Sequence, residues 1–143
     1  MEIRSPELKI ALLGLPMFLV WEIVQSPFFT DTFEDPWDRV LYNRIHCSGG
    51  DVMILLGAFW LVAVIWGRQW IVRDGVVATV SFLIAGVSYT VFSEYYNVSV
   101  ARNWDYSRWM PAIGSIGLVP IFQWPLVPSL IIRVVRSSNS RNK

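Results

Sequence analysis

The residues best suited to chemistry are acids, amides and a histidine that border or interrupt long apolar segments. Glu22 and Gln25 lie near the end of the first such segment, and Glu94 and Asn97 lie near the end of the third. Two carboxylic acids from different helices in a low-dielectric pocket hold their protons unequally, which sets a proton donor beside an acceptor. Glu22 and Glu94, with His46 assisting, are therefore candidates for acid–base catalysis.

The stretch from His46 to Asp51 borders the second apolar segment and has two interpretations. If a helix begins near Ser48, then Ser48 and Asp51 cap its first turn, and the acid stabilises the positive end of the helix dipole. If the helix begins earlier, Cys47 and Asp51 share one face, with His46 adjacent. Because imidazole, thiolate and carboxylate are all metal ligands, His46, Cys47 and Asp51 are candidates for a single metal ion, although their spacing is a weak signal.

Other polar and aromatic residues at the same level are candidates for ligand binding. They are Gln25, Asp51, Tyr89, Asn97, Trp104, Gln123 and Trp124. A structural interpretation stands beside each of these functional ones. Glu22 and Glu94 can mark the membrane interface or bond a neighbouring helix, and tryptophans usually serve packing or an interfacial belt.

Composition determines the surroundings in which these residues act. The chain has 143 residues, of which 54% are hydrophobic and 16% charged, whereas soluble domains average about 45–50% and about 25%. An aromatic content of 15% excludes a disordered chain. One cysteine excludes an intramolecular disulfide, and a net charge of +1 gives no sign of nucleic-acid binding. The sequence therefore predicts a membrane protein.

Four apolar segments are long enough to cross a bilayer, which takes about 20 residues of helix. They lie at about residues 10–29, 46–68, 75–95 and 111–132. The charge-free part of the second segment is short, so polar residues at its ends must enter the membrane. We expect one all-α domain over residues 1–143, an integral membrane antiparallel four-helix bundle.

The distribution of basic residues predicts the orientation of this bundle. The two chain ends and the short connection after the second segment carry Arg4, Lys9, Arg68, Arg73, Arg133, Arg136, Arg141 and Lys143. The two longer connections carry Arg39, Arg44, Arg102 and Arg108. Because basic residues in short loops stay in the cytoplasm, both termini are predicted to be cytoplasmic, and the polar level lies toward the periplasm.

Four strings of residues resemble a family of small bacterial four-span inner-membrane proteins. They are His46-Cys47-x-x-Gly50-Asp51, Tyr89-Thr90-Val91-Phe92-Ser93-Glu94-Tyr95-x-Asn97-Val98, Trp104-x-Tyr106-Ser107-x-x-Met110-Pro111 and Gln123-Trp124. The resemblance covers most of the chain and implies a multi-pass protein of a bacterial inner (plasma) membrane. It implies no activity.

The expected function is binding of a lipid-like ligand or a metal ion in a polar pocket at the periplasmic end. The bundle is alternatively an accessory subunit of a membrane complex, or a homo-oligomer. A second hypothesis is a membrane-embedded acid–base enzyme, of isomerase or hydrolase type, acting on a lipid or isoprenoid substrate. Expected partners are the lipid bilayer and a hydrophobic small molecule, with no nucleic acid. A transporter is disfavoured because the inner half lacks a polar path.

Overall fold

The computed structural model describes residues 5–73 and 75–140. These residues form five α-helices: α1 (Pro6–Gln25), α2 (Asp31–Glu34), α3 (Trp37–Trp66), α4 (Val76–Tyr95) and α5 (Leu118–Ser140). Shorter turns of other helical types continue or connect them: η1 (Ser26–Phe28), η2 (Arg68–Ile71) and η3 (Tyr96–Val100). The molecule is mostly helical, which confirms the prediction of an all-α fold at this level.

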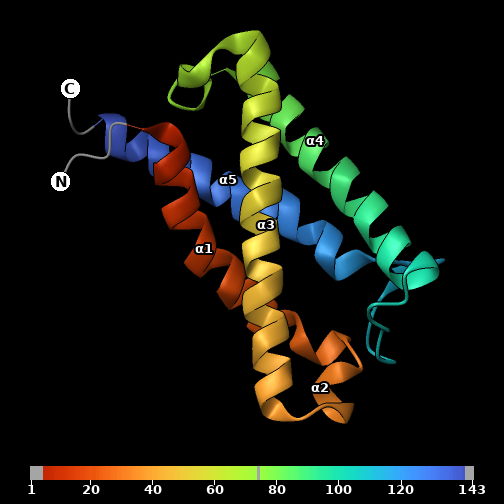
Figure 1. Ribbon diagram of the computed structural model, residues 1–143. Helices are drawn as coiled ribbons and strands as arrows, with labels where there is room; N and C mark the ends of the chain where they lie inside the picture. The colour runs from red at the N-terminus through yellow and green to blue at the C-terminus, as the bar shows by residue number, and fades with distance from the viewer. Residues whose placement is uncertain (1–4, 74, 141–143) are drawn as a thin grey trace.

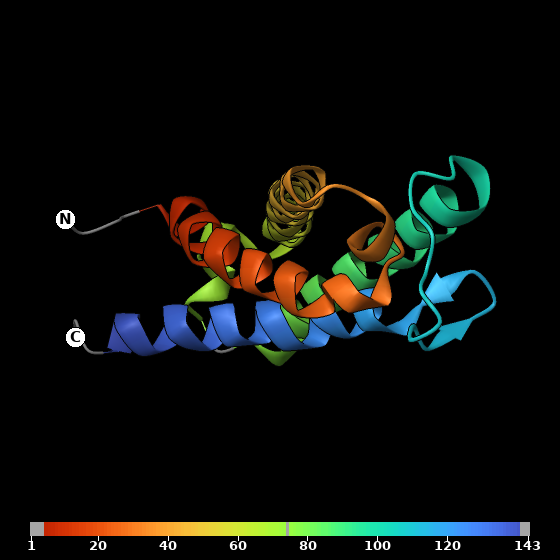
Figure 2. The same cartoon turned by 90° about the horizontal axis from the view of Figure 1, so that it is seen from below.

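The four long helices pack as a closed ring. α1 and α4 each pack against both α3 and α5. Figure 1 shows α5 crossing behind α3 at a steep angle, and Figure 2 shows α3 almost end-on while α1 and α5 run side by side. The start of α1 and the end of α5 lie at the same end of the molecule (Figure 2). The helices therefore cross one another more than the alignment of a regular antiparallel bundle would require.

Three segments are long and apolar enough to cross a membrane. They are Trp37–Trp66, Val76–Val100 and Leu118–Ser140. Between 22% and 44% of the residues in each apolar window are buried inside the molecule, so most of these side chains face outward. An apolar surface of that extent is typical of a protein surrounded by lipid.

α3 contains the second expected span, at residues 46–68, but it begins nine residues earlier than that span. α3 starts at Trp37, directly after Pro36, whose ring permits a helix after it but not through it. The stretch from His46 to Asp51 is therefore helix interior, and the interpretation of Ser48 and Asp51 as a cap is wrong. The buried Ser48 hydroxyl donates instead to the Arg44 carbonyl oxygen, at 2.7 Å, so it caps no helix end.

The last span also differs from expectation at its start. Residues 111–117 are not helical, because β1 (Ala112–Ile113) pairs antiparallel with β2 (Ile116–Gly117). Gly114 lies in the turn of this hairpin with φ of 61°, in the left-handed region that favours glycine. α5 then begins at Leu118 and continues to Ser140, beyond the expected end near residue 132.

An aromatic cluster fills the centre of the ring of helices. The side chains of Phe18, Phe59, Trp70, Phe82 and Trp124 are fully or almost fully buried. Their contacting rings have centroids 5.1 to 6.5 Å apart. Gly86 allows the close approach of Trp124, since a Cβ at Gly86 would lie 1.9 Å from the indole ring. The cluster belongs to one apolar core shared by α1, α3, α4, α5 and η2.

An ion pair links the start of α1 to the connection between α3 and α4. The Arg68 guanidinium donates from Nε to Glu7 Oε1 at 2.7 Å, and it also stacks over the Trp60 ring. Burial alone would raise the pKa of Glu7. Hydrogen bonds from the Ser5 hydroxyl and the Glu7 backbone N–H, together with Arg68, outweigh burial and lower this pKa below its usual value.

Candidate functional site

A cavity of about 580 Å³ opens where α1 and α4 end and α5 begins, with α2 and the first half of α3 forming its other walls. We call this region the cavity end of the molecule. The residues around the cavity include nine that the sequence singled out. They are Glu22, Gln25, His46, Cys47, Asp51, Glu94, Asn97, Trp104 and Gln123. The fold thus brings polar residues that are far apart in the sequence to one cavity.

Hydrogen-bonded side chains from three helices lie along one wall of the cavity. The Trp21 indole N–H donates to Gln25 Oε1 at 2.9 Å, and the Gln25 amide donates to Glu22 Oε1 at 2.7 Å. From α5, the Gln123 amide donates to Asp51 Oδ2 at 2.6 Å. Three helices, α1, α3 and α5, therefore contribute to one polar network.

The two acids in the middle of this network contact each other. The Glu22 and Asp51 carboxyl groups are within hydrogen-bonding reach. A carboxylate has no proton to donate, so two carboxyl groups form such a bond only when they share a proton. A carboxyl pair of this kind places an acid beside a base when one proton is shared. From the sequence, Glu22 is paired with Glu94, and Asp51 is a candidate for a helix cap, a metal ligand or a ligand-binding residue.

Glu94 has a separate partner from the loop between α4 and α5. The Tyr106 hydroxyl donates to Glu94 Oε2 and accepts from the backbone N–H of Gly117 at 2.8 Å. Burial raises the pKa of Tyr106, and the neighbouring Glu94 raises it further. The Trp104 indole N–H also faces Glu94 without completing a hydrogen bond. Tyr106 orients the Glu94 carboxyl toward the cavity.

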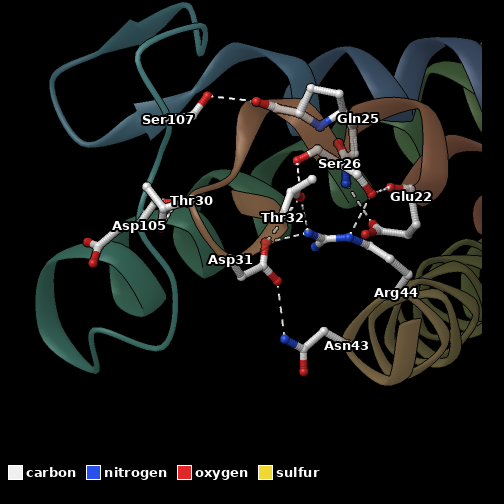
Figure 3. A network of polar contacts seen from close by, with 11 residues as sticks. Glu22, Gln25, Ser26, Thr30, Asp31, Thr32, Asn43, Arg44, Asp105 and Ser107 are labelled. Atoms are coloured by element: carbon white, nitrogen blue, oxygen red, sulfur yellow. Dashed lines mark hydrogen bonds and ion pairs between the residues drawn. The ribbon is translucent and has the colours of Figure 1, made fainter. Parts of the chain in front are cut away.

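Arg44 anchors the wall of the cavity end and was not anticipated from the sequence. Figure 3 shows its side chain reaching from α3 toward the segment after α1. The guanidinium forms an ion pair with Asp31 and donates to Ser26 Oγ at 2.8 Å and Thr32 Oγ1 at 3.1 Å. It also lies over the Phe29 ring, 5.4 Å from the centroid. Its four-residue spacing from Ser48 on the buried face of α3 is the signal that would have found it.

The two longer connections form a roof held together by main-chain bonds. The Thr30 N–H donates to the Asp105 carbonyl oxygen at 3.1 Å, and the Ser107 N–H donates to Phe28 O at 2.9 Å. The Ser107 hydroxyl adds a bond to Pro27 O at 2.7 Å (Figure 3). The loop after α4 is thus tied to the end of α1.

Some predicted site residues lie apart from the polar network. Tyr89 is exposed on the outside of α4, with its ring against Phe92. Trp124 lies in the aromatic cluster, fully buried. His46 lines the cavity edge but is exposed, and its ring stacks on Tyr42 at 5.9 Å between centroids. The helical turn of α3 directs Asp51 inward and the imidazole outward, so His46 does not join the acids.

The structure gives no support to a metal site. Across residues 5–73 and 75–140, no three His, Cys, Asp or Glu side chains are grouped so that they could hold a metal ion. Cys47 and Asp51 lie one turn apart on the same face of α3, but the exposed His46 side chain points away from them.

No protein-family model, curated protein or solved structure matches this chain. The resemblance carried by the four strings therefore stays a prediction. The assignment of a function depends on the cavity and its side chains.

Proposed function

We propose that the chain crosses a bacterial inner membrane four times, with both termini in the cytoplasm. The outward face of α1 supports its role as the fourth span, because Leu12, Leu15, Val20 and Val24 are between 48% and 64% exposed. The excess of basic residues at the chain ends supports the orientation. We expect alkaline phosphatase to be active when fused after Glu34 and inactive when fused at the C-terminus. The reverse pattern would contradict the orientation.

We further propose that the cavity binds the polar head of a lipid-like ligand. The observation that carries this proposal is the approach of two carboxylic acids, Glu22 and Asp51, in the wall of a cavity of about 580 Å³. Ionisable groups among apolar helices are costly to bury and usually mark a functional site. A ligand whose head lies in the cavity can keep its apolar chain in the surrounding lipid.

Mass spectrometry of the protein purified in mild detergent tests this function. We expect a lipid-like molecule to be retained by the wild type and lost from Glu22→Gln and Asp51→Asn, because each change replaces a carboxylate with an amide of nearly the same shape. Asp38→Asn is the matched control, since Asp38 is exposed on the same helix as Asp51 and outside the cavity. Equal retention by all four proteins would contradict the proposal.

The adjacent Glu22 and Asp51 carboxyl groups also favour a second function, acid–base catalysis on a lipid or isoprenoid substrate. A protonated carboxyl beside a carboxylate supplies both an acid and a base. In this hypothesis Glu22 and Asp51 form the reacting pair, and Glu94 holds the substrate. We expect the enzyme to convert a bound lipid in a way that Glu22→Gln abolishes without unfolding. Chemically unchanged lipid after prolonged incubation with wild-type protein would argue for binding alone.

A further inference from the structure

The charged residues around the cavity disfavour a purely anionic head group. Seven carboxylic acids line it, against two arginines. Of these arginines, Arg44 is already bound to Asp31, Ser26 and Thr32. The carboxylic acids around the cavity, Glu22, Asp51 and Glu94 among them, therefore outnumber its arginines. A ligand group that enters this region is stabilised by a positive charge.

Thr90 supplies an independent sign of a ligand. It is 8% exposed and lines the cavity one helical turn before Glu94. Its hydroxyl oxygen has no hydrogen-bond partner among the residues that the structure describes. By contrast, the Thr79 hydroxyl on the same helix donates to the carbonyl oxygen of Gly75, at 2.9 Å. A buried hydroxyl left unpaired is costly, so its position indicates a partner that comes from the cavity.

Trp104 requires a different partner. Its indole N–H lines the cavity and is likewise unpaired within residues 5–73 and 75–140. An indole N–H can only donate, and its approach to Glu94 completes no hydrogen bond, so it can donate to an oxygen acceptor on the ligand. The acids and Thr90 accept from a donor, whereas Trp104 donates to an acceptor. The head group therefore carries both kinds of atom.

The lining also separates a primary ammonium from a quaternary one. A quaternary ammonium has no N–H and is recognised by cages of aromatic rings. Phe29 and Trp104 are the aromatic residues among those described around the cavity, and the Arg44 guanidinium already covers Phe29. Carboxylates and a hydroxyl are instead suited to N–H donors.

We infer that the cavity recognises a primary ammonium carried beside an oxygen acceptor, the chemistry of a phosphoethanolamine head group. The ammonium lies against Glu22, Asp51 and Thr90, and the oxygen accepts from Trp104. This inference rests on the proposed ligand-binding function and specifies its ligand. The same chemistry occurs in a phosphatidylethanolamine lipid and in soluble phosphoethanolamine.

Native mass spectrometry of the full chain in detergent tests the inference. The protein is offered equal amounts of phosphatidylethanolamine, phosphatidylcholine and phosphatidylglycerol with identical acyl chains. We expect about tenfold stronger retention of phosphatidylethanolamine than of either other lipid, as the loss of one charge-assisted hydrogen bond implies. Thr90→Val should reduce this retention about tenfold, and Thr90→Ser should restore it. Ser88→Ala, at an exposed position on α4 outside the cavity, is the control.

The outcomes separate the inference from the function on which it rests. A preference for phosphatidylcholine or phosphatidylglycerol that is lost in Asp51→Asn would overturn the ammonium head group and leave the lipid cavity intact. Retention of all three lipids to the same extent in every variant would overturn both. Displacement of the lipid by soluble phosphoethanolamine at equal concentration would support the head group and identify a soluble ligand. If Thr90→Val does not fold, the ranking of the three lipids by the wild type decides.

Discussion

Arg44→Met should destabilise the cavity end by about 2–3 kcal/mol. The Arg44 side chain is 6% exposed, and its partner Asp31 is 18% exposed. Removing one member of a buried ion pair typically costs about 3–5 kcal/mol, because the other charge is left unpaired. We expect the lower value because water still reaches Asp31. The loss of the Ser26 and Thr32 hydrogen bonds is included in this figure.

The assay is equilibrium unfolding in detergent, with Arg39→Met as the matched control. Arg39 pairs with Asp35 at 4.0 Å, but its side chain is 67% exposed, so its loss should cost less than about 1 kcal/mol. Combining Arg44→Met with Asp31→Asn should recover at least about 1 kcal/mol, because the stranded charge is removed as well. Equal losses for the two arginines, or strictly additive effects of the double change, would refute the assignment of Arg44 as a structural anchor.

Three further changes test other parts of the structure. Gly86→Ala should lower the free energy of unfolding by about 1–3 kcal/mol, because the new Cβ would overlap Trp124. Gly57→Ala is the control: a Cβ there has no neighbour within 4 Å, so the same assay should show unchanged or increased stability. Tyr106→Phe should cost about 1–2 kcal/mol by the same assay. Ultraviolet titration should show that the wild-type Tyr106 phenol, whose pKa is raised by burial and by an adjacent acid, stays protonated at about pH 10, where a free tyrosine is half ionised. The pKa of Glu7 is lowered in the folded protein. The stabilisation by the ionised Glu7 is therefore complete above the unfolded pKa of about 4.3, and it is lost as the pH falls through the lower pKa of the folded protein. Unfolding measured between about pH 6 and pH 3 should therefore show a weaker pH dependence in Glu7→Gln, and identical curves would contradict the ion pair.

The sequence alone determined the class of the protein and the level at which its polar residues gather. Apolar content and segment length are properties of short stretches of chain, so they indicate a helical membrane protein without knowledge of the packing. When successive apolar helices run in opposite directions, residues near their facing ends lie at one level, and Glu22, Asp51 and Glu94 line one cavity in the structure. Helix boundaries were less predictable, because Pro36 and the hairpin after Pro111 moved the starts of α3 and α5.

Only the tertiary structure decided which of these side chains meet. The rotation and crossing of each helix result from the packing of many side chains, and no short stretch of sequence contains that sum. This is why Asp51, and not Glu94, contacts Glu22, and why the exposed His46 lies outside their network. For the same reason Trp124 fills the aromatic cluster against Gly86 instead of facing a ligand.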